Sequence, residues 1–103
     1  MWYSASLMFK DVRTPPVLKD GPLWEERIRL VEASTEEEAT TRAEHLGRSI
    51  EHCFETEGGS LTWKLERVEV REILSDKLEH GTEVFYRYLR ESEALSLLTP
   101  FED

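Results

Sequence analysis

The sequence has few of the features that mark secreted, disulfide-bonded or membrane proteins. Cys53 is its only cysteine, which excludes a disulfide framework and suits a reducing compartment. No apolar run approaches the roughly 20 residues that a membrane-spanning helix needs. The amino terminus opens directly into a strand pattern, without the basic region and apolar core of a signal peptide. We therefore expect a cytoplasmic protein with no membrane partner.

Positive charge is also scarce. Thirteen Lys and Arg stand against 22 Asp and Glu, which gives a formal net charge of −9. The arginines alternate with acidic residues instead of clustering, so the chain offers no basic patch to a phosphate backbone. We expect no nucleic-acid partner. The acidity itself has two interpretations: it keeps the protein soluble, or it forms an acidic face for a basic protein partner.

Residues that commonly carry chemistry do not form a recognisable site. His45, His52 and Cys53 lie within nine residues, but on a straight helix the two histidines would be roughly 10 Å apart. No CxxC or HxxxH pair typical of zinc sites is present. Gly58 and Gly59 follow a predicted helix, whereas a phosphate-binding loop precedes one. The sequence thus predicts no metal, no cofactor and no catalytic residues, which favours a non-enzymatic role.

The strongest helical pattern runs from Ser34 to Phe54. Ser34 and Glu37 have the spacing of a capping box. An apolar stripe follows at helical spacing: Ala39, Ala43, Leu46 and Ile50, continued by a buried Cys53 or by Phe54. Such a narrow stripe predicts a helix that covers one face of a sheet. Gly47 is the weak point, and the helix either continues through it or ends there and restarts over 48–54.

Strand patterns flank this helix on both sides. They cover residues 2–12, 24–33, 61–74 and 82–90, and residues 13–23 form a proline-rich loop. Within 61–74 the apolar residues change parity, which predicts a bulge near Glu66–Arg67. The expected fold is α+β with the order β-β-α-β-β: a four-stranded, mainly antiparallel sheet with one long helix on one face and a short C-terminal helix. Residues 1–90 are expected to form a single domain, and residues 91–103 a helical tail.

The strands at 2–12 and 82–90 are apolar on both sides, so one helix cannot cover the whole sheet. The second face is then closed by residues 91–101 or by another chain. Glu26 stands out because it shares a side of its strand with Trp24, Ile28 and Leu30. It is either a binding or acid–base group, or a residue that reaches the rim or pairs with an arginine such as Arg87. The candidate binding residues are Trp2, Trp24, Glu26, Trp63, Tyr86 and Arg87.

Several blocks, taken together, resemble a known bacterial family, the domain of unknown function 4288. They are WYSASLMF, PLWEERIRLVEASTEEEA and AEHLGRS, then Trp63 with VEVREIL and GTEVFYRYL. The resemblance covers about residues 2–90 and leaves out the tail from Glu91. It implies a small bacterial domain whose signature residues are Trp2, Tyr3, Trp24, Glu25, Glu26 and Trp63. It carries no activity over to this chain, but strand-borne aromatic residues suit a structural or binding role.

Two hypotheses of function follow. The first is a protein-interaction domain that binds either a second copy of itself, as a homodimer, or a basic protein that it masks in the manner of an antitoxin or immunity protein. The alternative is a small-molecule-binding domain or enzyme, with a pocket between the sheet and the 13–23 loop. That pocket would be lined by Trp24, Glu26, Trp63, Tyr86 and Arg87.

Overall fold

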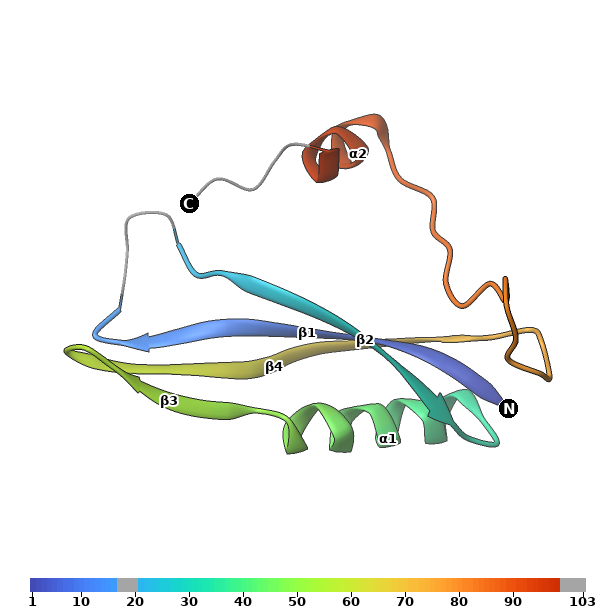
Figure 1. Cartoon of the computed structure of the whole chain (residues 1–103), viewed down its shortest axis with the longest axis horizontal. Helices are drawn as coiled ribbons and strands as arrows, with labels where there is room; N and C mark the ends of the chain where they lie inside the picture. The colour runs from blue at the N-terminus through green and yellow to red at the C-terminus, as the bar shows by residue number, and fades with distance from the viewer. Residues whose placement is uncertain (17–20, 99–103) are drawn as a thin grey trace.

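A computed structural model describes residues 1–16 and 21–98. The elements follow in the order β1 (Trp2–Thr14), β2 (Trp24–Glu32), α1 (Glu36–Ser49), β3 (His52–Thr56), β4 (Gly59–Glu72) and α2 (Glu91–Leu98). The strands form one curled antiparallel sheet in the order β2-β1-β4-β3, with α1 against one face (Figure 1). The predicted α+β fold with the order β-β-α-β-β is confirmed.

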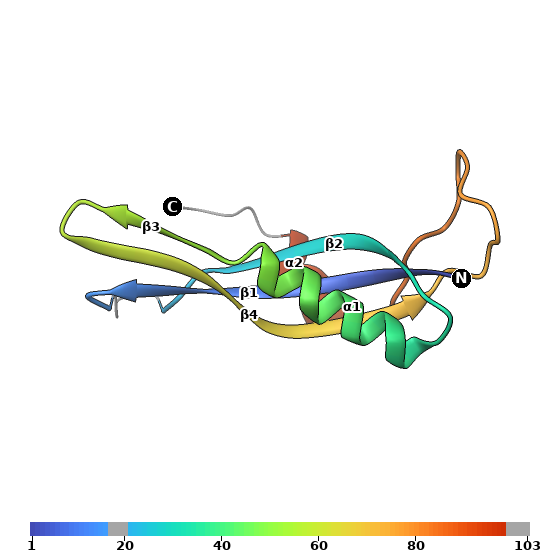
Figure 2. The same cartoon turned by 90° about the horizontal axis from the view of Figure 1, so that it is seen from below.

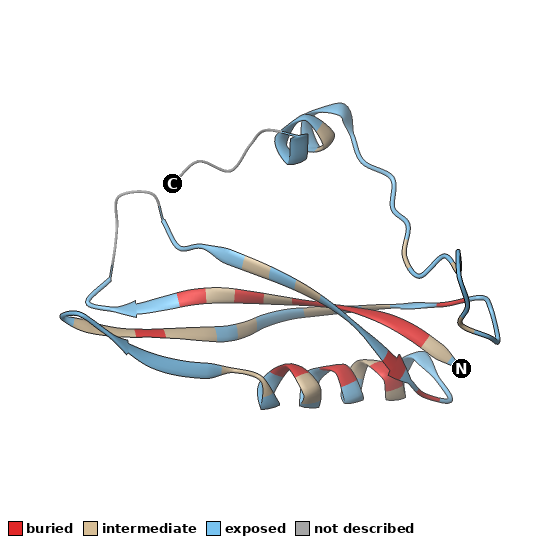
Figure 3. Cartoon of the chain, viewed as in Figure 1, coloured by how far each residue is buried: buried red, intermediate tan, exposed pale blue. Residues whose placement is uncertain are grey.

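The core lies between α1 and the centre of the sheet. Tyr3, Ala5, Leu7 and Phe9 alternate along β1, and all four are buried on the side that faces α1. Small residues on the helix meet them, because Ala39 and Ala43 allow a close approach. Figure 3 shows this core as the buried segments of β1 and of the inner side of α1. The alternating apolar residues of β1 therefore pack against the apolar stripe of α1, as predicted.

A β-bulge in β4 keeps the core side of the strand apolar from Leu61 to Val70. Met8 lies opposite Arg67 and Phe9 opposite Leu65, so Glu66 is the extra residue between them. The bulge returns Leu65 to the side of Val68 and Val70, and all three pack against the core. The predicted bulge near Glu66–Arg67 is confirmed.

The start of α1 lies one residue later than predicted. The Oγ1 of Thr35 accepts a hydrogen bond from the Glu38 backbone N–H at 3.1 Å, so Thr35 is the N-cap. The carboxylate of Glu38 accepts from the backbone N–H of Ser34 at 3.0 Å. The capping box predicted at Ser34 and Glu37 is therefore wrong by one position. Both Ser34 and Thr35 are good caps, and sequence spacing alone does not choose between them.

The helix runs through Gly47 and ends at Ser49, short of the predicted Phe54. A Cβ added to Gly47 would lie 2.7 Å from the Cδ2 of Leu65. Gly47 thus marks a close approach of α1 to β4 and not a break. Beyond it, residues 52–56 form β3, which pairs with β4 across the turn at Glu57 and Gly58. Gly58 has a φ of +85°, a conformation that favours glycine in such hairpins. Cys53 is exposed, contrary to the prediction that it is buried.

The strand predicted at 82–90 is wrong, because these residues have no place in the sheet. β3 occupies the outer edge of β4 from Gly59 to Trp63. At the next position, the Glu51 carboxylate accepts a hydrogen bond from the Leu65 backbone N–H at 2.8 Å. The local hairpin of β3 and β4 therefore supplies the fourth strand instead.

After β4 the chain leaves the sheet. Residues 73–90 contain no helix or strand, and they lead to α2 on the side of the sheet opposite α1 (Figures 1 and 2). The Cα radius of gyration is 16.4 Å, whereas a compact chain of this length has about 13 Å. Among the described residues, neither helix combines the length and apolar character required to cross a membrane.

Candidate functional site

The sheet face opposite α1, which we call the open face, carries the candidate site. No helix packs on it within the described residues, because α2 contacts none of the other elements. The residues that the strand registers place on it include Trp2, Ser4, Ser6, Met8 and Lys10 from β1, Trp24, Glu26, Ile28, Leu30 and Glu32 from β2, and Lys64, Arg67, Glu69 and Arg71 from β4. The open face is thus built from three adjacent strands.

An apolar row runs along β2 at the edge of this face. Trp24, Ile28 and Leu30 are 52%, 48% and 47% exposed. Their spacing of two or four residues places them on one side of a strand. The ammonium group of Lys10 lies 5.7 Å from the centre of the Trp24 ring, which holds the indole against β1. Glu26 shares this side of β2 and separates Trp24 from Ile28, so the row consists of three apolar side chains around one carboxylate.

The middle of the open face is formed by two buried serines of β1. The Ser6 hydroxyl donates a hydrogen bond of 2.6 Å to the Oε2 of Glu26, which orients that carboxylate on the face. The Ser4 hydroxyl has no hydrogen-bond partner among the described residues, although Ser4 is only 2% exposed. Glu26 is therefore anchored by a serine, and the structure does not pair it with Arg87.

A basic row on β4 completes the face. Lys64, Arg67 and Arg71 project from the same side of the strand, and Arg67 forms an ion pair with Glu69. Although the whole chain is acidic, the residues that the register pairs on this side of β4 include three cations and one carboxylate, with the exposed Glu66 at the bulge between Lys64 and Arg67. The open face is therefore apolar along β2 and basic along β4.

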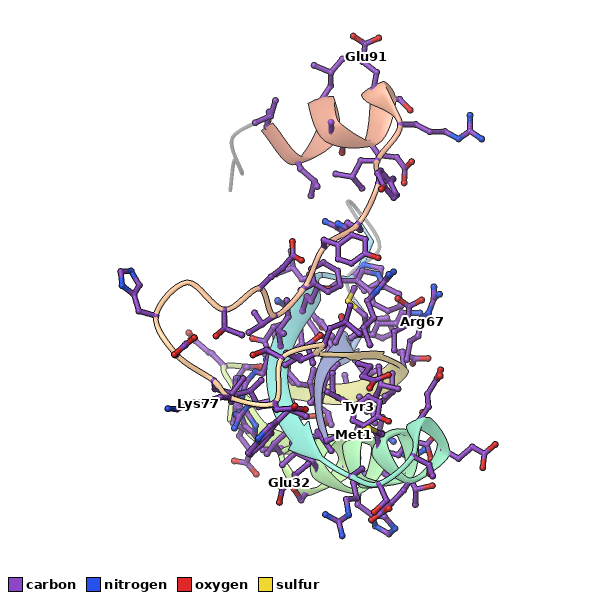
Figure 4. The ribbon with its side chains drawn as sticks, turned by 90° about the vertical axis from the view of Figure 1, so that its right-hand side faces the viewer. Met1, Tyr3, Glu32, Arg67, Lys77 and Glu91 are labelled. Atoms are coloured by element: carbon purple, nitrogen blue, oxygen red, sulfur yellow. The ribbon has the colours of Figure 1, made fainter. Side chains whose placement is uncertain are left out.

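Residues 82–98, which we call the C-terminal segment, are attached beside the basic row. Ile73 anchors the preceding loop, since its N–H donates to the Trp2 carbonyl at 2.8 Å. The Phe85 ring lies between two guanidinium groups, 5.3 Å from Arg71 and 5.9 Å from Arg87. Beyond Phe85 the segment departs, and Figure 4 shows Glu91 of α2 at the far end of the molecule from Tyr3 and Met1.

An open pocket of about 440 Å³ lies at this attachment point. Its lining comes from the end of β4 and from the following loop, and it includes Arg71, Glu79, His80, Thr82 and Tyr86. The volume is within the range of small-ligand sites. Among the described residues, no three His, Cys, Asp or Glu side chains gather where they could hold a metal ion.

The structure divides the predicted binding residues among three places. Trp24, Glu26 and Trp2 lie on the open face. Trp63 is on the other face, where it packs against the core. Tyr86 and Arg87 belong to the C-terminal segment. The structure therefore brings Trp24 and Glu26 together but separates them from Trp63 by the thickness of the sheet. Residues 17–20 of the 13–23 loop lie outside the described residues.

Sequence reasoning did not single out the basic row or the two serines. The signal was present, because Ser4, Ser6 and Met8 alternate with the buried residues of β1 and therefore share a face. The basic row was harder to find. Lys64 and Arg67 are three residues apart, and only the bulge at Glu66 brings them to the same side of β4. Ile28 and Leu30 were recognised as apolar but not as candidates for binding.

These features define a small α+β domain whose antiparallel sheet is covered by a helix on one face and carries an apolar and basic surface on the other. The chain belongs to the family described as domain of unknown function (DUF4288), whose model matches residues 2–86. The resemblance seen in the sequence is thereby confirmed. The match includes the sheet, α1 and the root of the C-terminal segment, and it ends before α2. Comparisons with curated proteins and with solved structures found no match.

Proposed function

We propose that this chain is a non-enzymatic protein-interaction domain that binds its partner through the open face. The observation that carries the proposal is the apolar row of Trp24, Ile28 and Leu30, three large side chains about half exposed on one side of an edge strand. Burying such a row stabilises a complex by roughly 25 cal/mol for each Å² removed from water. The proposed activity is therefore recognition of another protein.

The composition of the face supports a protein partner over a small molecule. Protein interfaces combine exposed aromatic and aliphatic side chains with arginine at their centre and a polar rim. The open face has this combination in Trp24 and the β2 row, next to Arg67 and Arg71. A small ligand needs a concave site that encloses most of its surface. The apolar row is instead linear, which suits the flat or extended surface of a protein.

The proposal is tested by introducing a negative charge into the apolar row. Immobilised wild-type chain is compared with the Ile28→Asp variant for retention of proteins from a lysate of the native host and of added copies of the chain itself. We expect the variant to lose a partner that the wild type retains, because a carboxylate in a buried apolar contact is costly. Circular dichroism confirms that the variant is folded.

The matched control is Phe54→Asp. Phe54 is 42% exposed, close to the exposure of Ile28, but it lies on β3 opposite Leu61 and so on the α1 side of the sheet. It is expected to retain the partner. If Ile28→Asp retains the same partners as the wild type and Phe54→Asp, binding through the open face is contradicted.

A further inference from the structure

We infer that the partner is a second copy of this chain, and that two copies exchange their C-terminal segments so that each segment lies on the open face of the other. The inference rests on the proposed function, since it assigns an occupant to the same face. Its basis is a surface and a segment of complementary character that, among the described residues, meet at Phe85 and Arg71 while α2 contacts no other element.

The segment has the apolar content of a packed element and lacks the contacts of one. Val84, Tyr86 and Tyr88 alternate along residues 84–88 and are all exposed, Tyr88 by 94%. The Tyr86 and Tyr88 rings meet edge to face with centres 6.2 Å apart. Leu97 and Leu98 of α2 are exposed as well. These side chains are apolar or aromatic, like those of the apolar row on β2.

The charges of α2 and of the open face also favour contact between the C-terminal segment and this face. α2 begins with Glu91 and Glu93 in its first turn and has no basic residue in its last turn. The Glu93 carboxylate accepts a hydrogen bond from the Arg90 backbone N–H at 3.0 Å, which places it at the helix start. The open face offers Lys64, Arg67 and Arg71 along β4. The acidic helix start thus complements the basic row, and Arg87 and Arg90 of the same segment precede it, on a chain whose net charge of −9 opposes self-association.

The root of the segment is held at the end of β4, where the Phe85 ring contacts Arg71 of the open face, and only the segment beyond Phe85 leaves the sheet. The Ile73–Trp2 hydrogen bond holds the loop to β1, and the turn that follows is closed by the Thr82 N–H donating to the Glu79 carbonyl at 3.0 Å. Arg71 holds Phe85 beside the end of β4. From there the chain rises off the sheet to α2, which contacts no other described element (Figures 1 and 4).

A second copy of the chain would cover the open face and would also give the C-terminal segment a surface to pack against. Exchange of identical segments creates two equivalent interfaces related by a twofold axis, and it closes the assembly at a dimer. The open face and the C-terminal segment each then gain the partner that the single chain does not provide.

Light scattering on mixtures of variants tests the exchange. The wild-type chain is expected to have the mass of a dimer. Ile28→Asp places a charge on the open face, and Tyr88→Asp places one on the C-terminal segment. Each variant alone is expected to raise the dimer dissociation constant by roughly a hundredfold. An equimolar mixture recovers dimers, because one interface of the mixed pair combines an intact face with an intact segment. Phe54→Asp is expected to remain dimeric.

Three results would overturn the inference. A wild-type chain that is monomeric at all concentrations has no second copy on its open face. A dimer that Tyr88→Asp leaves intact does not use the C-terminal segment. Failure of the mixture to recover dimers excludes reciprocal exchange. If the wild type is monomeric and yet retains another protein in a manner that depends on Ile28, the inference fails while the proposed function stands.

Discussion

At the scale of single residues, Gly47 controls how closely α1 approaches the sheet. Alanine in place of a helical glycine normally stabilises a protein by about 1 kcal/mol. Here the added Cβ would lie 2.7 and 2.9 Å from the two Cδ atoms of Leu65. We expect Gly47→Ala to gain less than this amount, or to lose stability. In a Leu65→Ala background, where the methyl groups are gone, the same change should recover the full gain.

Urea unfolding of the four proteins in this cycle measures the coupling between the two positions. The expected coupling energy is unfavourable, because the Cβ added by Gly47→Ala would collide with the methyl groups of Leu65, which Leu65→Ala removes. Equal effects of Gly47→Ala in both backgrounds would mean that the helix can shift without cost, and that glycine is not required by packing.

The buried Tyr3 is expected to make the stability of the folded chain depend on pH in the alkaline range. Burial, together with the charges of Glu72, Glu36 and Glu38, raises the pKa of the Tyr3 phenol above its ordinary value of 10.0. The unfolded chain therefore releases this proton first, and the stabilising contribution, which is complete below pH 10, is lost as pH rises through the folded-state pKa. Stability should fall with pH above about 10, and the Tyr3→Phe variant should fall less steeply.

Denaturant unfolding between pH 8 and 11 separates the two proteins. Below pH 10 their stabilities should run parallel, since the phenol is protonated in both the folded and unfolded states. Identical slopes above pH 10 would show that Tyr3 does not carry the alkaline dependence.

At the scale of elements, the cap of α1 is decided between neighbouring residues. Thr35 provides the side-chain oxygen that accepts from the Glu38 N–H, whereas Ser34 contributes its backbone N–H to the Glu38 carboxylate. Thr35→Ala is therefore expected to cost about 1 kcal/mol of unfolding free energy, and Ser34→Ala less than about half as much. Thermal unfolding of both variants checks this order. A larger loss for Ser34→Ala would place the cap where the capping-box spacing first suggested.

The elements also show which parts of the fold a sequence can reveal. The alternation in β1 and β2, the bulge in β4 and the stripe of α1 are local patterns, and each was predicted. β3 has only five residues, all exposed, so it carries no alternation, and its Cys53 and Phe54 continue the helical spacing of α1. Residues 82–90 have a good strand pattern, but which segment pairs with β4 depends on the whole fold, and the neighbouring β3 takes that place.

The candidate site was predictable to a similar extent. Trp24 and Glu26 were found because they share one side of a strand with Ile28 and Leu30. Trp63 was grouped with them although it lies across the sheet, since the relative faces of two strands depend on their register and on the bulge between them. The covering of only one sheet face by α1 was anticipated from the narrow helix stripe. Which chain covers the other face depends on contacts beyond a single sequence.

At the scale of the whole molecule, the described part of the chain is extended and covers only one face of its sheet. The chain buries its core on one side of a four-stranded sheet and leaves the apolar row of β2 exposed on the other. The C-terminal segment lies on that side, where Phe85 contacts Arg71 of β4 and α2 contacts no other described element (Figure 2). Association of two copies would bury the row, the segment and the basic side of β4 together, and it would make the function of the domain depend on its concentration.

Amide hydrogen exchange, measured over a range of protein concentrations, tests this account most directly. In the single chain, residues 84–90 belong to no helix or strand, so their amides should exchange rapidly at low concentration. At high concentration we expect protection to appear in residues 84–90 and to increase in residues 24–30, while the amides of α1 stay unchanged. Rapid exchange of residues 84–90 at every concentration would contradict the claim that a second copy binds the C-terminal segment.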